Sequence, residues 1–537
     1  MQSHGPANQP SWQICDWGRF ENRGLKLDWQ GLCLLLITGS LVYQFMLGVY
    51  RLYFHSLARF PGPKLAAFSY WYEAYYNALL GGKYFRVIDE LHRRYGHAVR
   101  INPDEVHFDD PESIELLFPT GGRRTNKPWE IQKRTGTPDS LVATVDHDTH
   151  RRRRNAISPF FSTARIRALD PIMQEHMAKL LVRMEHAARR RVIIRMHPLI
   201  KACTSDIINI YAFGDSFHFL DREDLGQPYY QATDVFFALT HWFGHFTWFA
   251  DLVHSLPFGL VALLAPPMEE MYRKKTAWVS QLQHFRKSPD SDNIKSTIFE
   301  GVLRGTLPSE DKSDWRLVNE AQLVVFAGEG TTAYTLTAAI YEILAHPTVA
   351  QKLRDELVQA LPDPEAIPYF AQVDSLPYLN AVIQEAVRIH PGVMGRQVRI
   401  SPDVDIVYRD KSSGVEHILP RGMRSSMSPL STHMNAEVFK NPYEFEPQRW
   451  IDNPSLGWAF HGFSRGSRNC VAMNFARKEM AVFLATIFRK YDLYCGQEGK
   501  TLELYDTERS RDIDPTSDFI IPVPAEGSKG LRVRIRN

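Results

Sequence analysis

The chain has 537 residues, a length that favours either several domains or one large fold. Its 63 basic and 61 acidic residues leave a net charge of +2, so composition gives no reason to expect a nucleic-acid partner. The cysteines are few, odd in number and without CxxC spacing, which excludes a disulfide framework and a cysteine-based zinc site. They are Cys15, Cys33, Cys203, Cys470 and Cys495. A reducing compartment is therefore expected for the main body.

Residues 31–50 form an apolar, uncharged stretch about as long as a helix that crosses a bilayer. A buried core helix and a signal peptide are the alternatives. The stretch is long for a signal peptide, and no small-residue cleavage site follows it. We therefore predict an uncleaved transmembrane helix over 31–53, preceded by an N-terminal segment 1–30. Basic residues balance on the two sides, so charge does not orient the helix.

The sequence FPGPKLAA at 60–67 follows this helix. Two prolines around a glycine cannot continue a helix, so 54–67 is predicted to form a stiff elbow. The remaining residues, 68–537, mix helical patterns with short strand-like runs at 395–425 and near 518–536, and show no internal repeat. We predict one large, mainly α domain with small β-sheets behind the N-terminal helix.

Two apolar segments of this domain can be interpreted in advance. Residues 313–347 have the pattern of one long, largely buried helix that stops before Pro347. Residues 229–266 are unusually aromatic. Two interpretations fit this stretch equally well. It is either part of an ordinary core or a surface that dips into a membrane or lines an apolar entry route.

The loop FSRGSRNC at 463–470 ends in Cys470, directly before a helical pattern. A thiol at the front of a helix is favoured as a thiolate, which binds soft or borderline metals including haem iron. Arg468 can pair with an anionic group of a cofactor. Taken alone, a single cysteine is explained as well by a small buried apolar side chain.

Four positions of this loop, Phe463, Gly466, Arg468 and Cys470, match FxxGxRxC in order, and the loop resembles the haem-binding loop of the cytochrome P-450 family. The resemblance implies that Cys470 is the axial ligand of haem b (iron protoporphyrin IX) and that the other three residues hold the cofactor. The family usually has glycine two residues after the cysteine, where this chain has Ala472.

The resemblance extends to a buried ion triad. Glu385 and Arg388 resemble the family's ExxR pair and share one face of a helix. FEPQRW supplies Arg449 as the third member. Such a triad is costly unless every polar atom is satisfied, so a structural role is expected, holding the cysteine loop against the core. Alone, ExxR would be read as a surface helical pair.

The stretch AGEGTT at 327–332 resembles the family's oxygen-activation segment. Gly328 leaves room above a flat cofactor, and Thr331 can hydrogen-bond bound oxygen or a water. The alternative is a glycine-weakened helix whose threonine bonds its own backbone. The family usually has an acid immediately before the threonine, where this chain has Gly330. Glu329, the third predicted catalytic residue, lies about 100° away on a regular helix, so the proton route stays open.

Residues 146–161 resemble the helix whose WxxxR residues contact a haem propionate. The aligned positions are His150 and Arg154, and both are predicted to bind the cofactor. Arg396 or Arg399 is expected to supply another propionate contact, with Arg396 preferred. The run of arginines that includes Arg154 can also be a solvated or targeting surface.

The resemblance implies a membrane-anchored monooxygenase that inserts one oxygen atom of O₂ into a lipophilic substrate by hydroxylation or epoxidation. No flavin or nicotinamide fingerprint follows the haem loop. Electrons are therefore expected from NADPH through a separate cytochrome P-450 reductase, with cytochrome b5 as an additional candidate. A positive face at Arg151–Arg153, with Arg477 and Lys478, can attract an acidic flavoprotein. The implied topology places 1–30 in the lumen and the body on the cytosolic face of the endoplasmic reticulum.

The finer resemblance is to fungal enzymes of secondary metabolism related to trichodiene oxygenase, carried by 50–67, HRRRRNAISPFFS and FHGFSRGSRNCVAMNFA. It implies a terpenoid substrate first, then a polyketide or alkaloid. Gly330 leaves open a haem-thiolate isomerase, dehydratase or peroxygenase. A non-catalytic haem-binding membrane protein is the third reading.

Overall fold

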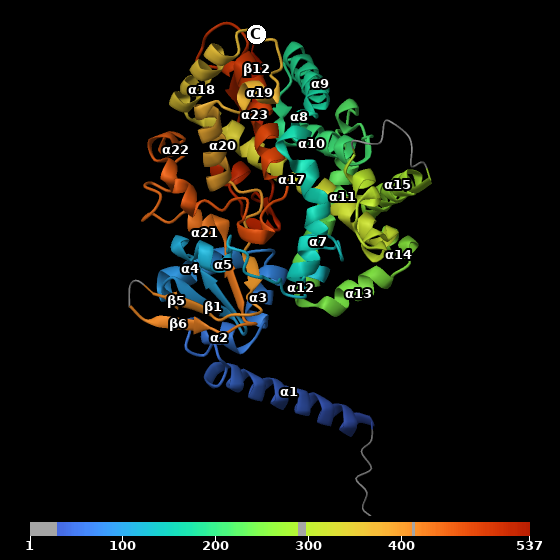
Figure 1. The fold of residues 1–537 in the computed structure, drawn as a ribbon, viewed down its shortest axis with the longest axis vertical. Coiled ribbons are helices and arrows are strands. Elements are labelled where there is room, and N and C mark those ends of the chain that lie inside the picture. The colour runs from blue at the N-terminus through green and yellow to red at the C-terminus, as the bar shows by residue number, and fades with distance from the viewer. Residues whose placement is uncertain (1–28, 288–296, 411–413, 537) are drawn as a thin grey trace, which may run out of the picture.

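The computed structural model describes residues 29–287, 297–410 and 414–536 (Figure 1). Helices make up most of the body, and small sheets lie among them, several next to the end of the N-terminal helix. The predicted mainly α fold with small β-sheets is therefore confirmed. Nearly all of the predicted lumenal segment, residues 1–28, lies outside the described residues.

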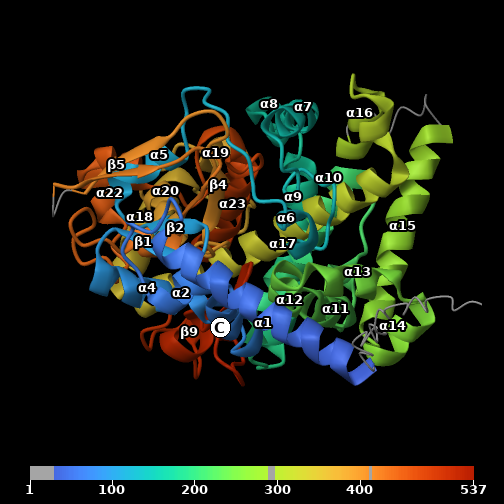
Figure 2. The ribbon, with the colours of Figure 1, turned by 90° about the horizontal axis from the view of Figure 1, so that it is seen from below.

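The first helix, α1 (Trp29–Tyr53), projects from the body as a nearly isolated rod (Figures 1 and 2). Most of its apolar side chains are exposed, and Gly48 is its buried residue. Gly48 lies against the ring of Phe68 in α2 (Lys64–Phe68), since a Cβ there would come within 2.0 Å of that ring. The helix is long and apolar enough to cross a membrane, as predicted, and this contact fixes its end to the body.

The predicted elbow, 54–67, is docked on the first strand. The backbone N–H of Arg100 donates to the carbonyl oxygen of Pro61 at 2.7 Å. A Cβ on Gly62 would lie 2.3 Å from the carbonyl oxygen of Arg100, so the close approach of the two backbones requires glycine. α2 follows the second proline, because proline is tolerated where the first helical N–H groups have no partner.

Four sheets are present in the described residues. The first has the strand order β1–β2–β7–β4, with β2 parallel to β7 and the other neighbours antiparallel. The second has the order β3–β12–β9–β8, and β5–β6 and β10–β11 form hairpins. The strands are β1 (Ala98–Asn102), β2 (Glu105–Phe108), β3 (Ile194–Arg195), β4 (Gln397–Ile400), β5 (Ile406–Arg409), β6 (Glu416–Leu419), β7 (Arg424–Met427), β8 (Asp492–Leu493), β9 (Thr501–Leu504), β10 (Ser517–Phe519), β11 (Ile521–Val523) and β12 (Arg532–Arg536). The strands predicted at 395–425 and near 518–536 are confirmed.

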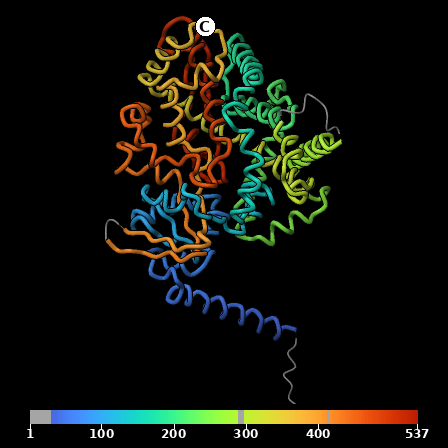
Figure 3. Tube along the Cα trace, in the orientation of Figure 1, coloured from blue at the N-terminus to red at the C-terminus, as the bar shows by residue number. Residues whose placement is uncertain are grey.

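The helical body surrounds one long helix, α17, which runs between α10 on one side and α20 and α23 on the other (Figures 1 and 3). The helices of the body are α3 (Trp71–Ala74), α4 (Tyr84–Tyr95), α5 (Ile114–Leu117), α6 (Ile131–Arg134), α7 (His147–Ile157), α8 (Thr163–Arg167), α9 (Asp170–Arg189), α10 (Met196–Phe213), α11 (Gln227–Ala238), α12 (Thr240–His245), α13 (Thr247–Ser255), α14 (Phe258–Leu264), α15 (Met268–Lys287), α16 (Ile298–Arg304), α17 (Asp314–Ala345), α18 (Pro347–Ala360), α19 (Phe370–Val373), α20 (Pro377–Ile389), α21 (Pro429–His433), α22 (Gln448–Asp452) and α23 (Met473–Lys490).

The helix predicted over 313–347 is confirmed by α17. The Ser313 hydroxyl caps its start by accepting from the backbone N–H of Arg316. The helix ends at Ala345, because Pro347 disfavours helical geometry at the residue before it. α17 is also long and apolar enough to cross a membrane, but most of it is buried in the body, so we treat it as a core helix.

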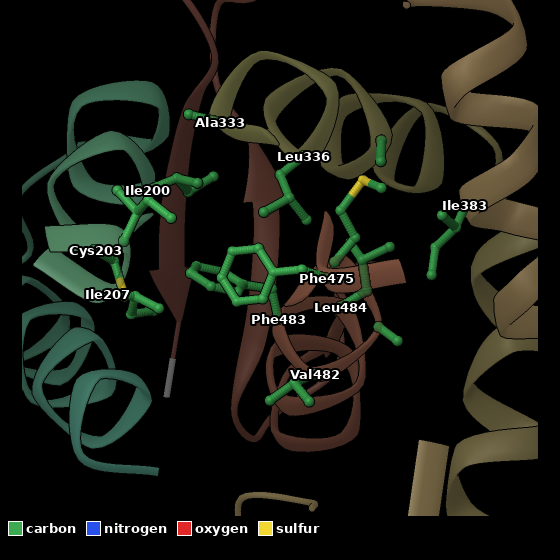
Figure 4. Close-up of a cluster of buried hydrophobic side chains, with 14 of the residues drawn as sticks. Ile200, Cys203, Ile207, Ala333, Leu336, Ile383, Phe475, Val482, Phe483 and Leu484 are labelled. Carbon is green, nitrogen blue, oxygen red and sulfur yellow. The ribbon is translucent and has the colours of Figure 1, made fainter. Parts of the chain in front are cut away.

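The main hydrophobic core joins α10, α17, α20 and α23 (Figure 4). Leu336 of α17 and Phe483 of α23 are fully buried, as is Cys203 of α10. Burial raises the pKa of the Cys203 thiol well above its usual range, so this cysteine is an apolar core residue. The other side chains labelled in Figure 4 are Ile200, Ile207, Ala333, Ile383, Phe475, Val482 and Leu484.

The aromatic stretch 229–266 divides into two parts. In α11 and α12, Tyr229, Tyr230 and Phe243 are buried core residues. In α13 and α14, which meet at an angle of 112°, a group of large apolar side chains is exposed. It comprises Trp248, Leu252, Phe258, Leu260, Leu263 and Leu264. The core interpretation thus holds for the first part and the surface interpretation for the second.

Candidate active site

A cavity of about 680 Å³ lies between α17, α7, α12 and the loop that precedes α23. Cys470 and Thr331 both line its wall. So do Gly328, Phe463, Arg468, His150, Arg154, Arg396 and Arg399. Gly466 and Glu329, which were also predicted as site residues, are not among the lining residues. The structure therefore gathers predicted residues from four distant parts of the sequence around one space.

The loop before Cys470 is held by tight backbone contacts. Gly466 has a φ of +69°, and a Cβ there would lie 2.6 Å from the carbonyl oxygen of Pro119. Both observations require glycine at this position. The backbone N–H of Cys470 donates to the carbonyl oxygen of Phe463 at 2.8 Å, closing the loop on itself. Gly466 thus shapes the loop, and the sulfur is presented to the cavity.

The Cys470 side chain is open to the cavity although protein surrounds that cavity. Burial raises the pKa of the thiol, against the opposing effects of the Ala472 backbone N–H and the Arg154 guanidinium. In the protein without a metal, burial therefore opposes the thiolate that the helix start is predicted to favour. α23 begins at Met473, three residues too late for its N–H groups to outweigh burial. A bound metal cation would favour the thiolate.

Glu385, Arg388 and Arg449 form a compact buried triad. Arg388 Nε and Nη2 donate to the two Glu385 carboxylate oxygens, each at 2.8 Å, and Arg449 Nε donates to Oε1 at 3.0 Å. Trp450 Nε1 donates to Oε2 at 2.8 Å. Arg388 Nη1 also donates to the carbonyl oxygen of His433 at 2.9 Å. Every partner needed to offset the burial of these charges is therefore supplied by the protein.

A second group of buried charges, next to Cys470, is not balanced in this way. We call Lys127, Arg154, Arg399 and Arg468 the cation group. They donate to neutral acceptors: Lys127 to Val142 O at 2.7 Å, Arg154 to Asn469 Oδ1 at 2.6 Å, Arg399 to Ser464 Oγ at 3.1 Å and Arg468 to Val145 O at 2.7 Å. No carboxylate within the described ranges forms an ion pair with them. Burial, helped by Arg468, lowers the pKa of Arg399 to about 9.

His150 lies beside the cation group at the cavity wall. Burial, followed by the positive charge of Arg468 and its neighbours, lowers the pKa of His150 to about 2. The imidazole is therefore neutral at physiological pH and can donate one hydrogen bond into the cavity. Because four cations and a neutral donor share this wall, the site is built for an anionic ligand.

On α17, Thr331 donates from Oγ1 to the carbonyl oxygen of Ala327 at 2.7 Å. This is the backbone bond expected of a mid-helix threonine, and the side chain still lines the cavity. A Cβ on Gly328 would come within 2.6 Å of the Ile208 side chain on α10. Gly328 therefore serves the close packing of α10 on α17 as well as leaving space in the cavity.

Glu329 points away from the cavity. Its Oε2 accepts a hydrogen bond from Ser205 Oγ on α10 at 2.7 Å, and burial raises the pKa of its carboxyl to about 7. At the next position, a Cβ on Gly330 would lie 2.8 Å from the Ile521 side chain. Ile521 of β11 thus occupies the space that a side chain at position 330 would need.

The comparisons with known proteins agree with this geometry. A family model for cytochrome P-450 matches residues 62–511. The chain belongs to the cytochrome P-450 family. This P-450 is 38% identical over 507 residues to the cytochrome P-450 monooxygenase tpcC of Cochliobolus heterostrophus, covering 93% of this chain and 96% of the relative. The predicted family and enzyme class are therefore confirmed: the protein is a haem-thiolate monooxygenase.

Two further relatives of this P-450 have names that state a reaction. It is 34% identical to fusicoccadiene C-8 hydroxylase of Phomopsis amygdali over 523 residues, covering 93% of this chain and 96% of the relative. It is 33% identical to tryptophan 6-hydroxylase fscE of Fusarium equiseti over 523 residues, covering 96% and 98%. The predicted likeness to fungal P-450 enzymes of secondary metabolism is thus supported by full-length matches.

The P-450 family implies haem with a cysteine thiolate, and the residues around the cavity fit that group. Cys470 presents its sulfur to the cavity, and the cation group offers positive charge that the protein itself does not neutralise. Haem carries two carboxylates, which would neutralise part of that charge. Among the cavity residues that sequence reasoning missed are Lys127 and Asn469, which belong to no local motif.

Arg396 differs from Arg399 although both line the cavity of this P-450. Arg396 Nε donates to Glu105 at 2.7 Å, and its Nη2 pairs with Glu73. These two carboxylates already balance the Arg396 charge, whereas Arg399 makes no ion pair within the described residues. The geometry therefore favours Arg399 over the predicted Arg396 as a ligand for an anion.

The positive face predicted at Arg151–Arg153, with Arg477 and Lys478, is neutralised only in part, since Arg151 and Arg477 form no ion pair among the described residues. Arg152 and Arg153 both bond the buried carboxylate of Asp311, at 2.9 and 2.8 Å. Lys478, predicted to extend the same face, pairs with Asp374 at 3.0 Å. Arg152 and Arg153 thus have a structural role, fixing α7 to the segment before α17.

Proposed function

We propose that this P-450 is anchored in the endoplasmic reticulum membrane by α1 and oxygenates a lipophilic secondary metabolite by hydroxylation or epoxidation. A terpenoid is the first substrate class to test, then a polyketide or alkaloid. Electrons come from NADPH through cytochrome P-450 reductase, with cytochrome b5 as an additional donor. The observation that carries the proposal is the single cavity that has both Cys470 and Thr331 on its wall.

In this proposal Cys470 Sγ would supply the thiolate ligand to haem b, and Phe463 and Gly466 shape the loop that presents it. His150, Arg154, Arg399 and Arg468 bind the haem carboxylates, with Arg399 in the role first predicted for Arg396. Haem with a thiolate ligand supplies reductive activation of O₂ and attack on a C–H bond or alkene. The Glu385–Arg388–Arg449 triad keeps the loop in register without touching the cofactor.

Thr331 is the proposed proton-handling residue. Its hydroxyl proton is held on the Ala327 carbonyl oxygen. Rotation about χ1 would let Oγ1 donate the same proton into the cavity. Because Glu329 faces Ser205, we propose that Thr331 exchanges protons with cavity water rather than with this acid. The predicted catalytic role of Glu329 thereby becomes an indirect one.

Membrane association is supported by two exposed apolar features, α1 and the α13–α14 pair. A single span is enough to retain the protein at a bilayer, and the exposed leucines and Trp248 of the pair would add apolar contact at the interface. The apolar lining of much of the cavity supports a lipophilic substrate.

The test is reconstitution of the full-length protein with cytochrome P-450 reductase and NADPH in lipid vesicles, using a terpenoid, polyketide and alkaloid panel. We expect O₂-dependent product carrying one new oxygen atom, absent with Cys470→Ala and unchanged with Cys495→Ala. Product formed with peroxide but not with reductase would support the peroxygenase reading instead. Haem binding without turnover of any panel member would support the non-catalytic reading.

A further inference from the structure

One side of the cavity, formed by α6 and α12, carries a charged residue that the proposed reaction does not use. Arg134 is the last residue of α6 and lines the cavity. Its backbone carbonyl oxygen accepts a hydrogen bond from Thr240 Oγ1 at 2.8 Å. A Cβ on Gly244 would lie 3.4 Å from Arg134 Cγ, so the side-chain stem runs against α12. Two contacts therefore fix where this arginine lies.

The Arg134 guanidinium has no hydrogen bond or ion pair with any described residue, and its Nε is buried without a partner. This separates it from the other arginines of the same cavity. Arg396 and Arg424 form ion pairs with carboxylates, and the cation group donates to carbonyl, hydroxyl or amide oxygens. A buried charge without a partner is costly, so its retention indicates a partner that arrives with the ligand.

The acids near Arg134 differ in how far other groups engage them, although none of them pairs with Arg134 among the described residues; Glu130 Oε2 is left without a partner. Glu73 and Glu105 share Arg396 and also accept from Asn102. Glu130 accepts from Arg424 at 2.7 Å. The Asp518 carboxylate accepts from the backbone N–H of Ile520 at 2.9 Å and forms no ion pair with Arg134.

Burial lowers the pKa of Arg134, and Asp518 opposes that shift from a distance. The neighbouring imidazoles do not add charge, because burial lowers the pKa of His241 to about 4 and also lowers that of His245. Arg134 is thus a guanidinium without a hydrogen-bond partner among the described residues, beside neutral histidines and acids that do not pair with it, with apolar cavity wall beyond it. The apolar lining includes Ile157, Phe161, Ile208, Leu323 and Val324.

We propose that Arg134 binds a carboxylate of the substrate, and hence that this P-450 acts on acid-bearing lipophilic metabolites. The planar guanidinium fork matches the two oxygens of a carboxylate, and the apolar wall takes the rest of the molecule. The inference rests on the proposed function in one respect, that substrate occupies this cavity. Arg134 is a specificity-determining residue in this account and takes no part in bond making.

The test compares three probes of nearly equal shape with the full-length protein: 2-naphthoic acid, naphthalene-2-carboxamide and 2-naphthylmethylamine. Binding is measured by equilibrium dialysis at about pH 7.5, where the acid is an anion and the amine a cation. The variants are Arg134→Gln, which removes the charge, and Arg134→Lys, which keeps it. Arg93→Gln, an exposed arginine on α4, is the matched control. Thermal unfolding midpoints confirm that each variant is folded.

We expect wild type to bind the acid more tightly than the amide or the amine. Arg134→Gln should weaken acid binding by about 10–100-fold, the loss of one charge-assisted pair, and change amide binding by less than about threefold. Arg134→Lys should retain part of the preference, and Arg93→Gln all of it. If water alone solvates Arg134, Arg134→Gln leaves the acid affinity unchanged, and the proposal is wrong. Tighter binding of the amine by wild type would also overturn it.

The carbon-monoxide difference spectrum of the same samples keeps the two proposals separate. Arg134-dependent acid binding in protein without thiolate haem would retain the anion site and reject the proposed function. Thiolate haem and reductase-dependent turnover without any preference for acids would retain the function and reject the anion site.

Discussion

Two groups of charged residues inside this P-450 differ in the source of their counter-charge, which is either the protein's own carboxylates or a ligand. In the triad, Glu385 accepts from Arg388, Arg449 and Trp450, and Glu446 also pairs with Arg449, so the protein balances its own charges. In the cation group beside Cys470, Arg399 and its neighbours meet only neutral acceptors among the described residues. Because an unbalanced buried charge is costly, the first group is explained by folding and the second by a ligand.

The same comparison distinguishes arginines that line one cavity, including two that are only three residues apart. Arg396 is held by Glu73 and Glu105, whereas Arg399 is not. Arg424 is held by Glu130, whereas Arg134 is not. Burial and residue type are alike within each pair, so the presence of an internal carboxylate is what distinguishes a structural arginine from a ligand-binding one.

The largest effect is expected from breaking the balanced group. Glu385→Ala leaves Arg388 buried without a carboxylate and leaves Arg449 only the half-exposed Glu446, which should cost about 3–5 kcal/mol of folding free energy. We expect loss of most folded haem protein on expression and a lower unfolding midpoint in what remains. Glu90→Gln, at an exposed pair on α4, is the control and should change neither. If the Glu385 variant were as stable as wild type, the claim that the triad stabilises the fold would be wrong.

Glu329 is a buried acid that forms no ion pair among the described residues, and its contribution to the free energy of unfolding depends on pH. Burial raises its pKa from 4.5 to about 7. Between those values the folded protein holds a proton that the unfolded chain has lost, so stability falls as pH rises through that window and then levels off. Glu329→Gln should therefore exceed wild type by about 3 kcal/mol near pH 8 and match it below about pH 4.5. Parallel stability curves for the two proteins between these pH values would contradict the assignment.

Arg399→Met and Arg396→Met should have opposite effects, which sharpens the comparison. Removing Arg399 relieves repulsion in the apoprotein, so apoprotein stability should hold or rise while haem dissociates about 10–100-fold faster. Removing Arg396 strands Glu73 and Glu105, so apoprotein stability should fall with a smaller effect on haem retention. Haem transfer to apomyoglobin gives the dissociation rate, and thermal unfolding gives the stability. Faster haem loss from Arg396→Met than from Arg399→Met would reverse the assignment.

The smallest stability effect is expected at Thr331, an uncharged residue of the same wall. Its hydroxyl is satisfied by its own helix, so Thr331→Ala should change stability by less than about 1 kcal/mol. If the hydroxyl handles protons, the variant should consume NADPH with a lower yield of product per NADPH. Thr276→Ala on α15, which removes the corresponding backbone bond to the Tyr272 carbonyl oxygen away from the cavity, is the matched control. Unchanged product yield in Thr331→Ala would leave the residue without a catalytic role.

Much of the fold could be predicted because its signals are local. The length of the anchor, the proline that ends α17 and the glycine pattern before Cys470 each lie within a few residues of the feature they determine. The ExxR pair and Arg449 required the family resemblance, and the structure brings them together.

The roles that could not be predicted from the sequence are those set by contacts with residues far along the chain. Arg396 and Arg399 are three residues apart, yet Glu73 and Glu105 select between them. Gly330 is explained by Ile521 of the C-terminal hairpin, and the arginine run by Asp311. In each case a tertiary contact decides the role, and no local pattern contains it.

The central claim is that Cys470 supplies the thiolate to a haem held by the unbalanced cation group. The reduced carbon-monoxide difference spectrum of membranes containing wild type, Cys470→Ala or Cys495→Ala tests it most directly. We expect a thiolate-type Soret band in wild type and in Cys495→Ala, and its loss in Cys470→Ala. A thiolate-type band that persists in Cys470→Ala, or a histidine-type band in folded wild type, would contradict the account.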